Sequence, residues 1–368
     1  MQNKIPNKKN DGLYMLKGFA MFLVIAVHST QCFPNLNYGI EQLSRVGRWG
    51  CQLFFVISGF LMVKSWSNGS DIKDFYKRRF SSLIPGYYLA ILFYVCLSLI
   101  WNEKTGMFYP FHISKKSVLI NVFLVHGLSP SSFNSVVPGG WFIGTQCIFL
   151  ILFPLCIFIY EKSKKDQQKN IPYYGFTLSV LIQLGIYFYL EDYNVIKITS
   201  FLHYSFINQL PCFLLGISLY YEFKETKFKN KSIKKEIVFA MIWGSIATII
   251  FYLSNEVVVF SAIVAFIFSI AFRHLFIIGV LMKDRDYIGR QFLVDLGKVS
   301  YAAYYTNFVI CMLLPWIFFR YIDLEIDSTV LYIVGIIPMI YGTYISAVLL
   351  NKVLLFFTNK VNRLIEKI

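Results

Sequence analysis

Residues 13–32 read LYMLKGFAMFLVIAVHSTQC, an apolar stretch that carries one cation, Lys17, and one imidazole, His28. A helix of this length is enough to cross the roughly 30 Å hydrocarbon core of a membrane. The step from Lys17 to His28 makes three helical turns and a small remainder, so both face the same side, about 16 Å apart along the axis. Ionisable side chains at membrane depth usually face a bundle interior or a water-filled cavity. This pair therefore predicts a polar path into the membrane.

The composition extends this picture to the whole chain. Of the 368 residues, 57% are hydrophobic and 15% are charged, against about 25% charged in soluble domains. Apolar runs near the spanning length recur along the sequence. They lie at residues 13–32, 48–66, 83–101, 140–160, 173–190, 203–221, 237–254, 257–273, 299–319 and 329–351. The sequence therefore predicts an all-α polytopic membrane protein with about ten transmembrane helices. We expect residues 1–368 to form one domain, with no appended soluble domain.

The basic charge of the chain fits a membrane topology. The formal net charge is +15, and its distribution favours a topology signal over a nucleic-acid footprint. With both termini in the cytoplasm, 28 of the 35 lysines and arginines fall on the cytoplasmic side or at its helix ends. The seven on the outer side are Arg45, Arg48, Lys104, Lys115, Lys116, Lys197 and Arg320. This bias follows the positive-inside rule, so we predict cytoplasmic termini and no nucleic-acid partner.

A basic run, Lys77-Arg78-Arg79, precedes the apolar run at residues 83–101. Such a cluster beside a span is expected from topology alone. The functional alternative is a phosphate clamp, because guanidinium groups bind phosphate through paired hydrogen bonds. In that case Arg78 and Arg79 would hold phosphate at the mouth of the path that Lys17 opens.

The second predicted span contains the run FFVISGF at residues 54–60. Its small residues, Ser58 and Gly59, permit close contact between helices, and we favour that role for them. A nucleophilic Ser58 is disfavoured, because no acid–base triad order is visible in the sequence.

The longest predicted loop, residues 102–139, is expected on the outer side. It contains an apolar half-span, Val118–Val125, which is too short to cross and should be re-entrant or packed against the bundle. The next span starts at the outer interface with Trp141, which places Gln146 about a turn and a half into the membrane. We expect Gln146 to hydrogen-bond between helices or to share in substrate binding.

His28 has two interpretations on these grounds alone. One is a buried imidazole that hydrogen-bonds between helices, and the other is a functional group, which is the default for ionisable residues within a membrane. Imidazole titrates near neutrality, which suits it to general-base work on a hydroxyl. The seven cysteines form no C-x-x-C pair and no cluster with histidine, so no metal site is predicted.

Together these motifs resemble the acyltransferase 3 family of integral-membrane acyltransferases, over most of the chain. The family's Arg/Lys-x10-His pattern looks like Lys17 to His28, and its aromatic second span ending in Ser-Gly-Phe is similar to residues 54–60. The other similar stretches are the basic run with its X-Pro-x-Tyr sequence at residues 77–88, VVPGGW at 136–141, LPCFLLG at 210–216 and LGKVSY at 296–301.

The resemblance implies an O-acyltransferase that uses acyl-CoA, most simply acetyl-CoA, as its donor substrate, with no permanently bound cofactor. The implied acceptor is a hydroxyl of a bacterial cell-surface glycan or its lipid-linked precursor, and the implied location is the bacterial inner (cytoplasmic) membrane. The implied site residues are His28 as catalytic base, Lys17, Arg78 and Arg79 for the donor, and Ser58, Trp141 and Gln146 for substrate. An alternative from another class is a membrane transporter or flippase for a glycan or acyl group. The sequence lacks the paired broken helices that mark many transporters.

Four positions depart from the family's pattern. Two usual arginines are replaced by Ser82 and Gln209, a usual glutamate by Gln146, and a frequent histidine by Asn307. An amide at position 146 can hydrogen-bond but cannot take a proton. The departures concern the details of substrate binding and leave the Lys17–His28 pair intact.

Overall fold

The computed structural model describes residues 11–31, 33, 35–67, 71–100, 113–189, 195–225, 227–228, 230–253, 258–321 and 327–365. Within these residues every regular element is helical. The α-helices are α1 (Asp11–Thr30), α2 (Tyr38–Arg45), α3 (Gly50–Trp66), α4 (Ile72–Ile100), α5 (Lys115–Val122), α6 (Gly140–Lys162), α7 (Ile171–Tyr189), α8 (Val195–Tyr204), α9 (Phe206–Lys224), α10 (Ile233–Leu253), α11 (Val258–Leu281), α12 (Arg290–Lys298), α13 (Ser300–Tyr321) and α14 (Ser328–Ile365). The 3-10 helices are η2 (Val46–Trp49), η4 (His126–Leu128) and η5 (Gln168–Asn170).

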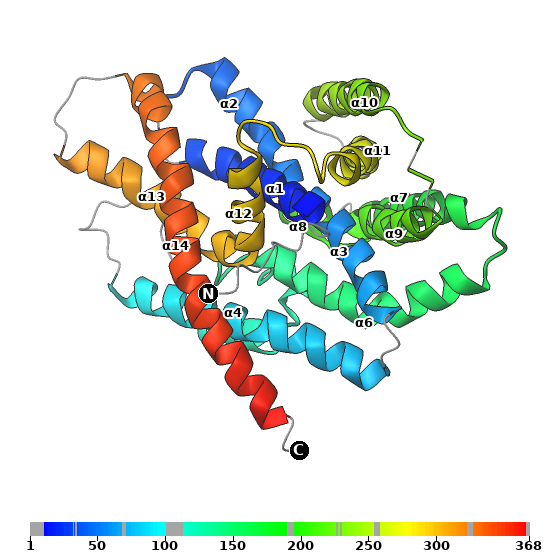
Figure 1. Ribbon diagram of the computed structural model, residues 1–368. Coiled ribbons are helices and arrows are strands. Elements are labelled where there is room, and N and C mark those ends of the chain that lie inside the picture. The colour runs from blue at the N-terminus through cyan, green and yellow to red at the C-terminus, as the bar shows by residue number, and fades with distance from the viewer. Residues whose placement is uncertain are drawn as a thin grey trace, which may run out of the picture.

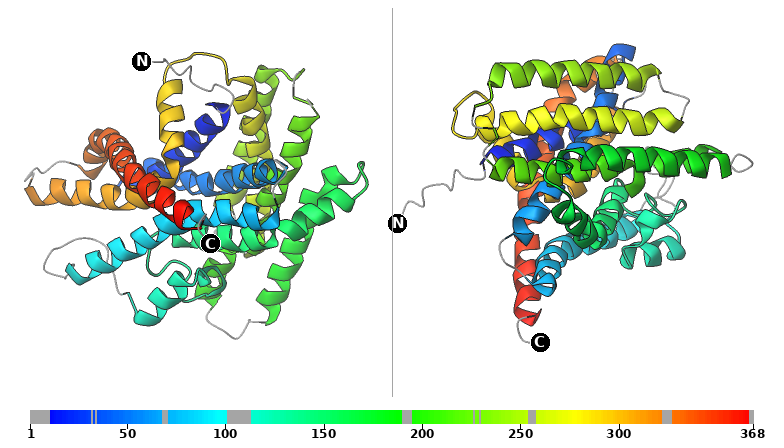
Figure 2. Two further views of the ribbon diagram at one scale, coloured as in Figure 1. Left: turned by 60° about the horizontal axis from the view of Figure 1, so that its bottom comes forward. Right: turned by 90° about the vertical axis from the view of Figure 1, so that its right-hand side faces the viewer.

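Helix α1 is the central element of this bundle (Figure 1). It contacts α3, α11, α12, α13 and α14. Helices α7, α9, α10 and α11 lie side by side, seen nearly end-on in Figure 1 and lengthwise in the right-hand view of Figure 2. The central place of α1 puts the helix that carries Lys17 and His28 inside the molecule.

Glycines set the closest helix crossings. Helices α3 and α9 cross at Gly59 and Gly216. A Cβ on Gly59 would lie 2.3 Å from the carbonyl oxygen of Phe213, and a Cβ on Gly216 would lie 2.1 Å from that of Val56. The two backbones therefore touch, as small residues allow in membrane bundles. The close-contact role predicted for Gly59 is confirmed.

Eight stretches of the described residues are helical, long and apolar enough to cross a membrane. They are Asp11–Thr30, Tyr38–Trp66, Ile72–Leu99, Gly140–Lys162, Ile233–Leu253, Ile263–Leu281, Ser300–Phe318 and Ser328–Asn359. Helices α7 and α9 occupy two further predicted spans but are not among the eight. Helix α9 carries the buried amides Asn208 and Gln209, which lower its apolar character. The protein is thus a polytopic all-helical bundle, while the number ten stays a prediction.

Several helices extend beyond the predicted apolar runs. Helix α4 begins at Ile72, although the predicted run began at residue 83, so the basic run lies on the helix itself and Pro85 falls inside it. Helix α14 continues to Ile365, beyond the predicted end at residue 351. The first turns of α4 are charged and carry no apolar signal, which explains the first difference. The extension of α14 includes the apolar run Val353–Phe357, so the predicted run ended too early there. The short helices α8 and α12 were not predicted, because their 10 and 9 residues are too few to give an apolar run of spanning length.

Candidate active site

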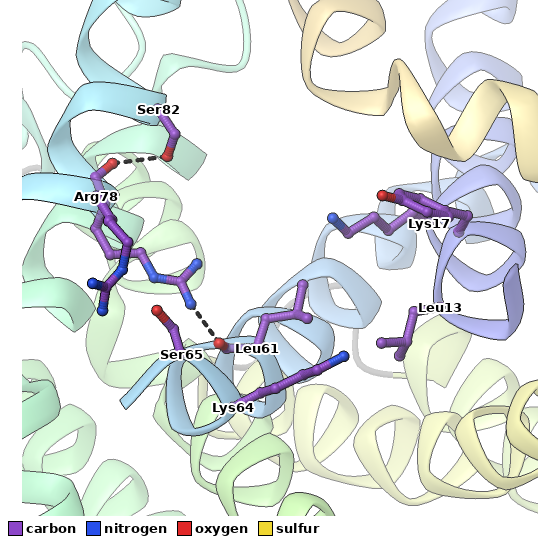
Figure 3. Close-up of a pocket in the computed structure, with 9 residues that line it drawn as sticks. Leu13, Lys17, Leu61, Lys64, Ser65, Arg78 and Ser82 are labelled. Carbon is purple, nitrogen blue, oxygen red and sulfur yellow. Dashed lines mark hydrogen bonds between the residues drawn. The ribbon is translucent and has the colours of Figure 1, made fainter. Parts of the chain in front are cut away.

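An open pocket of about 400 Å³ lies between the start of α1, the end of α3 and the start of α4 (Figure 3). Its lining residues are Leu13, Tyr14, Lys17, Leu61, Lys64, Ser65, Arg78, Arg79 and Ser82. Four of these nine residues are cationic and none is acidic, so the pocket attracts anions. Figure 3 shows the amino groups of Lys17 and Lys64 extending into it from different helices. We call it the basic pocket.

Two contacts with α12 hold the start of α1, from which Lys17 projects, and a third lies within α1 itself. The Asp11 Oδ2 lies 2.9 Å from the guanidinium of Arg290 on α12. A Cβ on Gly18 would lie 1.9 Å from a backbone oxygen of α12, so these two helices also touch backbone to backbone. The Lys17 Nζ lies 5.9 Å from the centre of the Tyr14 ring, within cation–π range. The first turns of α1 are therefore fixed in place, and with them the position of Lys17.

The two adjacent arginines differ in their surroundings. Arg79 is partly buried and donates to the carbonyl oxygen of Leu61 on α3, while its Nε is buried with no hydrogen-bond partner in the described part of the chain. Arg78 is exposed at the pocket rim. The Ser82 hydroxyl, one of the departures, donates to the Arg79 carbonyl at 2.9 Å and so bonds its own helix. Arg79 is thus a fixed cation with one spare donor, and Arg78 lies closer to solvent.

A second pocket, of about 160 Å³, continues from the basic pocket, with which it shares Lys17, Leu61 and Arg79. Its other lining residues are Phe54, Ile57, Ser58, Leu83, Phe142, Ile143, Gln146, Ser300, Tyr301 and Tyr304. We call it the inner pocket. Ser58 and Gln146, both predicted for substrate, meet here. The Gln146 Oε1 is buried and has no hydrogen-bond partner among the described residues, so it offers an acceptor to a bound group.

The VVPGGW stretch supports one wall of the inner pocket through its two glycines. The Tyr304 hydroxyl donates to the Gly139 carbonyl at 2.7 Å. Gly139 has a φ of 80°, and a Cβ there would lie 2.8 Å from that hydroxyl. A Cβ on Gly140 would lie 3.0 Å from the hydroxyl of Tyr87. Any larger residue at either position would displace a tyrosine, which explains why glycine is found at both.

Sequence reasoning missed the tyrosines of α13 as site residues. The Tyr305 hydroxyl donates to the Tyr301 hydroxyl at 2.7 Å, and Tyr301 donates to the carbonyl of Leu83 on α4. The signal that could have found them is the run SYAAYYTN at residues 300–307, because its tyrosines recur at helical spacing on one face.

His28 lies apart from both pockets. Its Nδ1 lies 3.1 Å from the Oε1 of Gln31, and its ring meets the edge of Phe308 with the ring centres 5.5 Å apart. Neither pocket has His28 in its lining. Phe308 lies one helical turn beyond Tyr304 on α13, so one face of that helix leads from the inner pocket to His28. The structure therefore brings together Lys17, Arg78 and Arg79, but it does not bring His28 to them.

Trp141 also lies outside the lining of the two pockets. Its ring packs against Tyr204, with the centres 4.7 Å apart, and against Phe55 at 6.1 Å. It is 8% exposed. The geometry therefore places Trp141 as a packing residue between α3, α6 and α8, about a turn and a half from Gln146.

The half-span Val118–Val125 belongs to α5 and the turn that follows it, and α5 is too short to cross. The loop is held by His126, whose Nε2 lies 2.9 Å from the Gly140 carbonyl and 3.0 Å from the Tyr87 hydroxyl. Burial lowers the pKa of His126 from 6.5 to about 4. The imidazole is therefore neutral near pH 7, and its N–H donates to Gly140. This contact joins the loop after α5 to the start of α6.

Comparisons with known proteins cover the same region. A family model described as an acyltransferase domain, that of acyltransferase 3, matches residues 10–348, which include every candidate site residue. The chain is 26% identical over 335 residues to the O-acetyltransferase OatA of Staphylococcus aureus strains NCTC 8325 / PS 47, COL and MRSA252. The match covers 81% of this chain and 50% of each relative, so the chain spans about half the length of the curated relatives it matches. No solved structure matches it.

Proposed function

This chain belongs to the acyltransferase 3 family, and from that premise we propose that it transfers an acyl group from cytosolic acyl-CoA to a glycan hydroxyl. The acyl group is most simply acetyl, and the glycan is a bacterial cell-surface polymer or its lipid-linked precursor. The observation that carries the proposal is the continuity of the basic pocket with the inner pocket at Lys17 and Arg79. The relatives' name, O-acetyltransferase, supports transfer of acetyl to oxygen.

The basic pocket suits the phosphates of the donor. Acyl-CoA is a polyanion whose nucleotide would remain outside the hydrocarbon, because a charged group at membrane depth is costly. Lys17 and Arg79 would bind phosphate at the boundary between the two pockets, and Arg78 would do so at the rim. Guanidinium–phosphate contacts are charge-assisted and frequently paired, which favours this assignment over a neutral ligand.

The inner pocket suits the thin, polar arm that links the nucleotide to the thioester. Its volume of about 160 Å³ accepts a narrow chain rather than a nucleotide. The unpartnered Gln146 Oε1 is an acceptor for an amide N–H of that arm. The hydroxyls of Ser58 and Ser300 line the same pocket and supply further polar contacts.

His28 is proposed as the general base. Its neutral imidazole would take the proton of the sugar hydroxyl while that oxygen attacks the thioester carbonyl carbon. The carbon–sulfur bond then breaks, and the departing thiolate of coenzyme A takes the proton from the imidazolium. Reaching His28 requires the thioester to extend about one helical turn, or ~6 Å, past Tyr304 toward Phe308.

The three helix ends at the donor pocket bear on its membrane side. The start of α1, the end of α3 and the start of α4 meet at the basic pocket, so they lie at one face of the bundle. The positive-inside pattern supports the cytoplasm as the compartment on that face. We propose cytoplasmic termini, a cytoplasmic membrane location and entry of acyl-CoA from the cytosol.

Transfer of label from acetyl-CoA tests the proposal. Purified protein in lipid nanodiscs is given [¹⁴C-acetyl]-CoA and a lipid-linked glycan, and both glycan label and free coenzyme A are measured. Equimolar appearance of O-acetyl glycan and coenzyme A is expected. A transporter or flippase would move the glycan between leaflets without consuming thioester, and that result would replace the proposal with the alternative from the other class.

A further inference from the structure

A third cavity, of about 310 Å³, lies between α4, α13 and α14. These helices are side by side, with α14 crossing the other two in Figures 1 and 2. Leu89 and Phe93 contribute from α4, Val309 and Ile310 from α13, and Leu350 from α14. We call this cavity the apolar groove. It is separate from the two pockets assigned to the donor, since it shares no lining residue with them.

The few hydroxyls in the apolar groove are already committed. Thr306 donates to a backbone carbonyl of its own helix at 3.5 Å, and Ser346 does the same at 3.0 Å. The hydroxyl of Tyr94 donates to the Tyr305 carbonyl at 3.3 Å, and that of Tyr305 donates to Tyr301. No lining hydroxyl is therefore left to donate to a polar headgroup or a sugar. The chemistry of the groove fits a hydrocarbon chain.

The groove opens toward the lipid of the membrane, which contains such hydrocarbon chains. All three helices include stretches apolar and long enough to cross a membrane. Leu92 on α4 is 60% exposed, and Ile345 and Leu349 on α14 are 58% and 59% exposed. Apolar side chains exposed to this extent on spanning helices face lipid. The groove therefore opens among lipid-facing side chains, and an apolar cavity of this kind excludes water and accepts an apolar guest.

One layer of tyrosines separates the apolar groove from the donor site. Tyr305 lines the groove and Tyr301 lines the inner pocket, and their hydroxyls are joined at 2.7 Å. A chain in the groove thus lies next to the wall behind which the donor arm is proposed to bind. A substrate lipid must bind near the donor for transfer to occur, whereas a phospholipid that only fills a crevice could bind anywhere on the lipid-facing surface. The position of the groove beside this wall therefore favours a substrate lipid.

We propose that the apolar groove holds the hydrocarbon chain of the lipid-linked acceptor, and that it thereby fixes the carrier while the attached sugar reaches the reacting groups. This inference rests on the proposed acyl transfer and deepens it, because it makes the acceptor a membrane-bound carrier lipid and not a finished, carrier-free polymer.

Photolabelling tests the occupant without relying on activity. The full chain in nanodiscs is exposed to a polyprenyl phosphate with a diazirine in its chain, or to a phosphatidylglycerol with the same group, and labelled peptides are identified by mass spectrometry. The polyprenyl probe is expected to label peptides containing residues 89–94, 305–310 and 346–350. Ser346→Trp should reduce this labelling by about tenfold, since excluding two methylene groups or more has that cost. Ile345→Trp is the matched control, because Ile345 is adjacent but does not line the groove.

Equal labelling by the phosphatidylglycerol probe, or labelling unaffected by Ser346→Trp, would overturn the assignment to the acceptor. A kinetic arm then compares a lipid-linked glycan with the same glycan released from its carrier. Ser346→Trp is expected to raise the KM for the first and leave that for the second unchanged, and an equal rise for both would contradict the inference. A wild type that is labelled in the groove but acetylates neither glycan would instead refute the proposed function.

Discussion

The two ends of helix α1 differ in a way that would separate the proposed donor binding from the proposed chemistry. At one end Lys17 opens onto a pocket with four cations and is held by the contact of Asp11 with Arg290. At the other end His28 is half-buried, with its ring against Phe308 and its Nδ1 near the exposed Gln31, and it lines neither the basic pocket nor the inner pocket. Lys17 therefore lies in the proposed donor pocket, while the proposed base lies outside the lining of both pockets. Substitutions at the two ends should accordingly have different effects.

The largest effect is expected at the His28 end. His28→Ala removes the proposed base and should lower the rate of acyl transfer by about 10²–10⁴-fold, the usual contribution of positioned proton transfer. The dissociation constant for acetyl-CoA should be unchanged, because Lys17, the proposed phosphate ligand on α1, lies about 16 Å away along that helix. Label transfer and equilibrium binding, measured on the same folded preparation, check both parts.

His28→Gln is the matched variant for this test. It keeps a hydrogen-bonding side chain near Gln31 but cannot act as a base near neutrality. We expect it to be as impaired as the alanine variant. Full transfer by either folded variant would remove His28 from the mechanism, and loss of acetyl-CoA binding would show that the two ends are not separable.

The next effect is expected at the open end. Arg79→Ala should weaken acetyl-CoA binding by about 1.5–3 kcal/mol, the worth of a hydrogen bond to a charged group. Arg78→Ala should cost less, because Arg78 is exposed and solvent screens its charge. Turnover at saturating donor should change little in both. Isothermal titration with acetyl-CoA measures the difference, and equal, unchanged affinities would reduce the pair to topology markers.

A smaller effect is expected from the contact that holds the open end. Arg290→Ala leaves the carboxylate of Asp11, which is 15% exposed, without its partner, at a cost of about 1–3 kcal/mol. The thermal midpoint of the protein should fall, and acetyl-CoA should restore part of the loss by binding the folded state. Arg290→Lys should recover part of the loss, because a single guanidinium nitrogen of Arg290 contacts both Asp11 and the Lys283 carbonyl, and an ammonium nitrogen also has donors for both. An unchanged midpoint would mean that α1 is held by its glycine contacts alone.

The sequence predicted the central elements of the fold well. The predicted run at residues 13–32 became α1 at Asp11–Thr30, and the run at 140–160 became α6 at Gly140–Lys162. These runs have polar residues on both sides, so the apolar signal and the helix nearly coincide. The start of α4 at Ile72 was missed because its first turns are charged, and hydropathy does not detect a helix outside the membrane.

The candidate site was predictable only in part, for a related reason. The meeting of Lys17 with Arg79 followed from residue types and from the resemblance to a family. The bond from Tyr304 to Gly139 joins residues far apart in the sequence, and nothing local to either one indicates it. The position of His28 against Phe308 of α13 depends likewise on a residue far away in the sequence. Spacing along α1 predicted one polar path past both side chains, but it could not show that Lys17 lines a pocket while His28 lies outside the two pockets.

The smallest effect is expected at Gln146, which lies between the two ends of the comparison. Its Oε1 is an unpartnered acceptor in the inner pocket, and a carboxylate at the same position would present an acceptor of the same shape. We therefore expect Gln146→Glu to change turnover by no more than about threefold, or ~0.7 kcal/mol. Gln146→Leu removes the acceptor and should weaken donor binding by about 0.5–1.5 kcal/mol. An inactive wild type that Gln146→Glu restores would show that a carboxylate is required there. The natural amide would then indicate a catalytically inactive site, even if acetyl-CoA still binds at the Lys17 end.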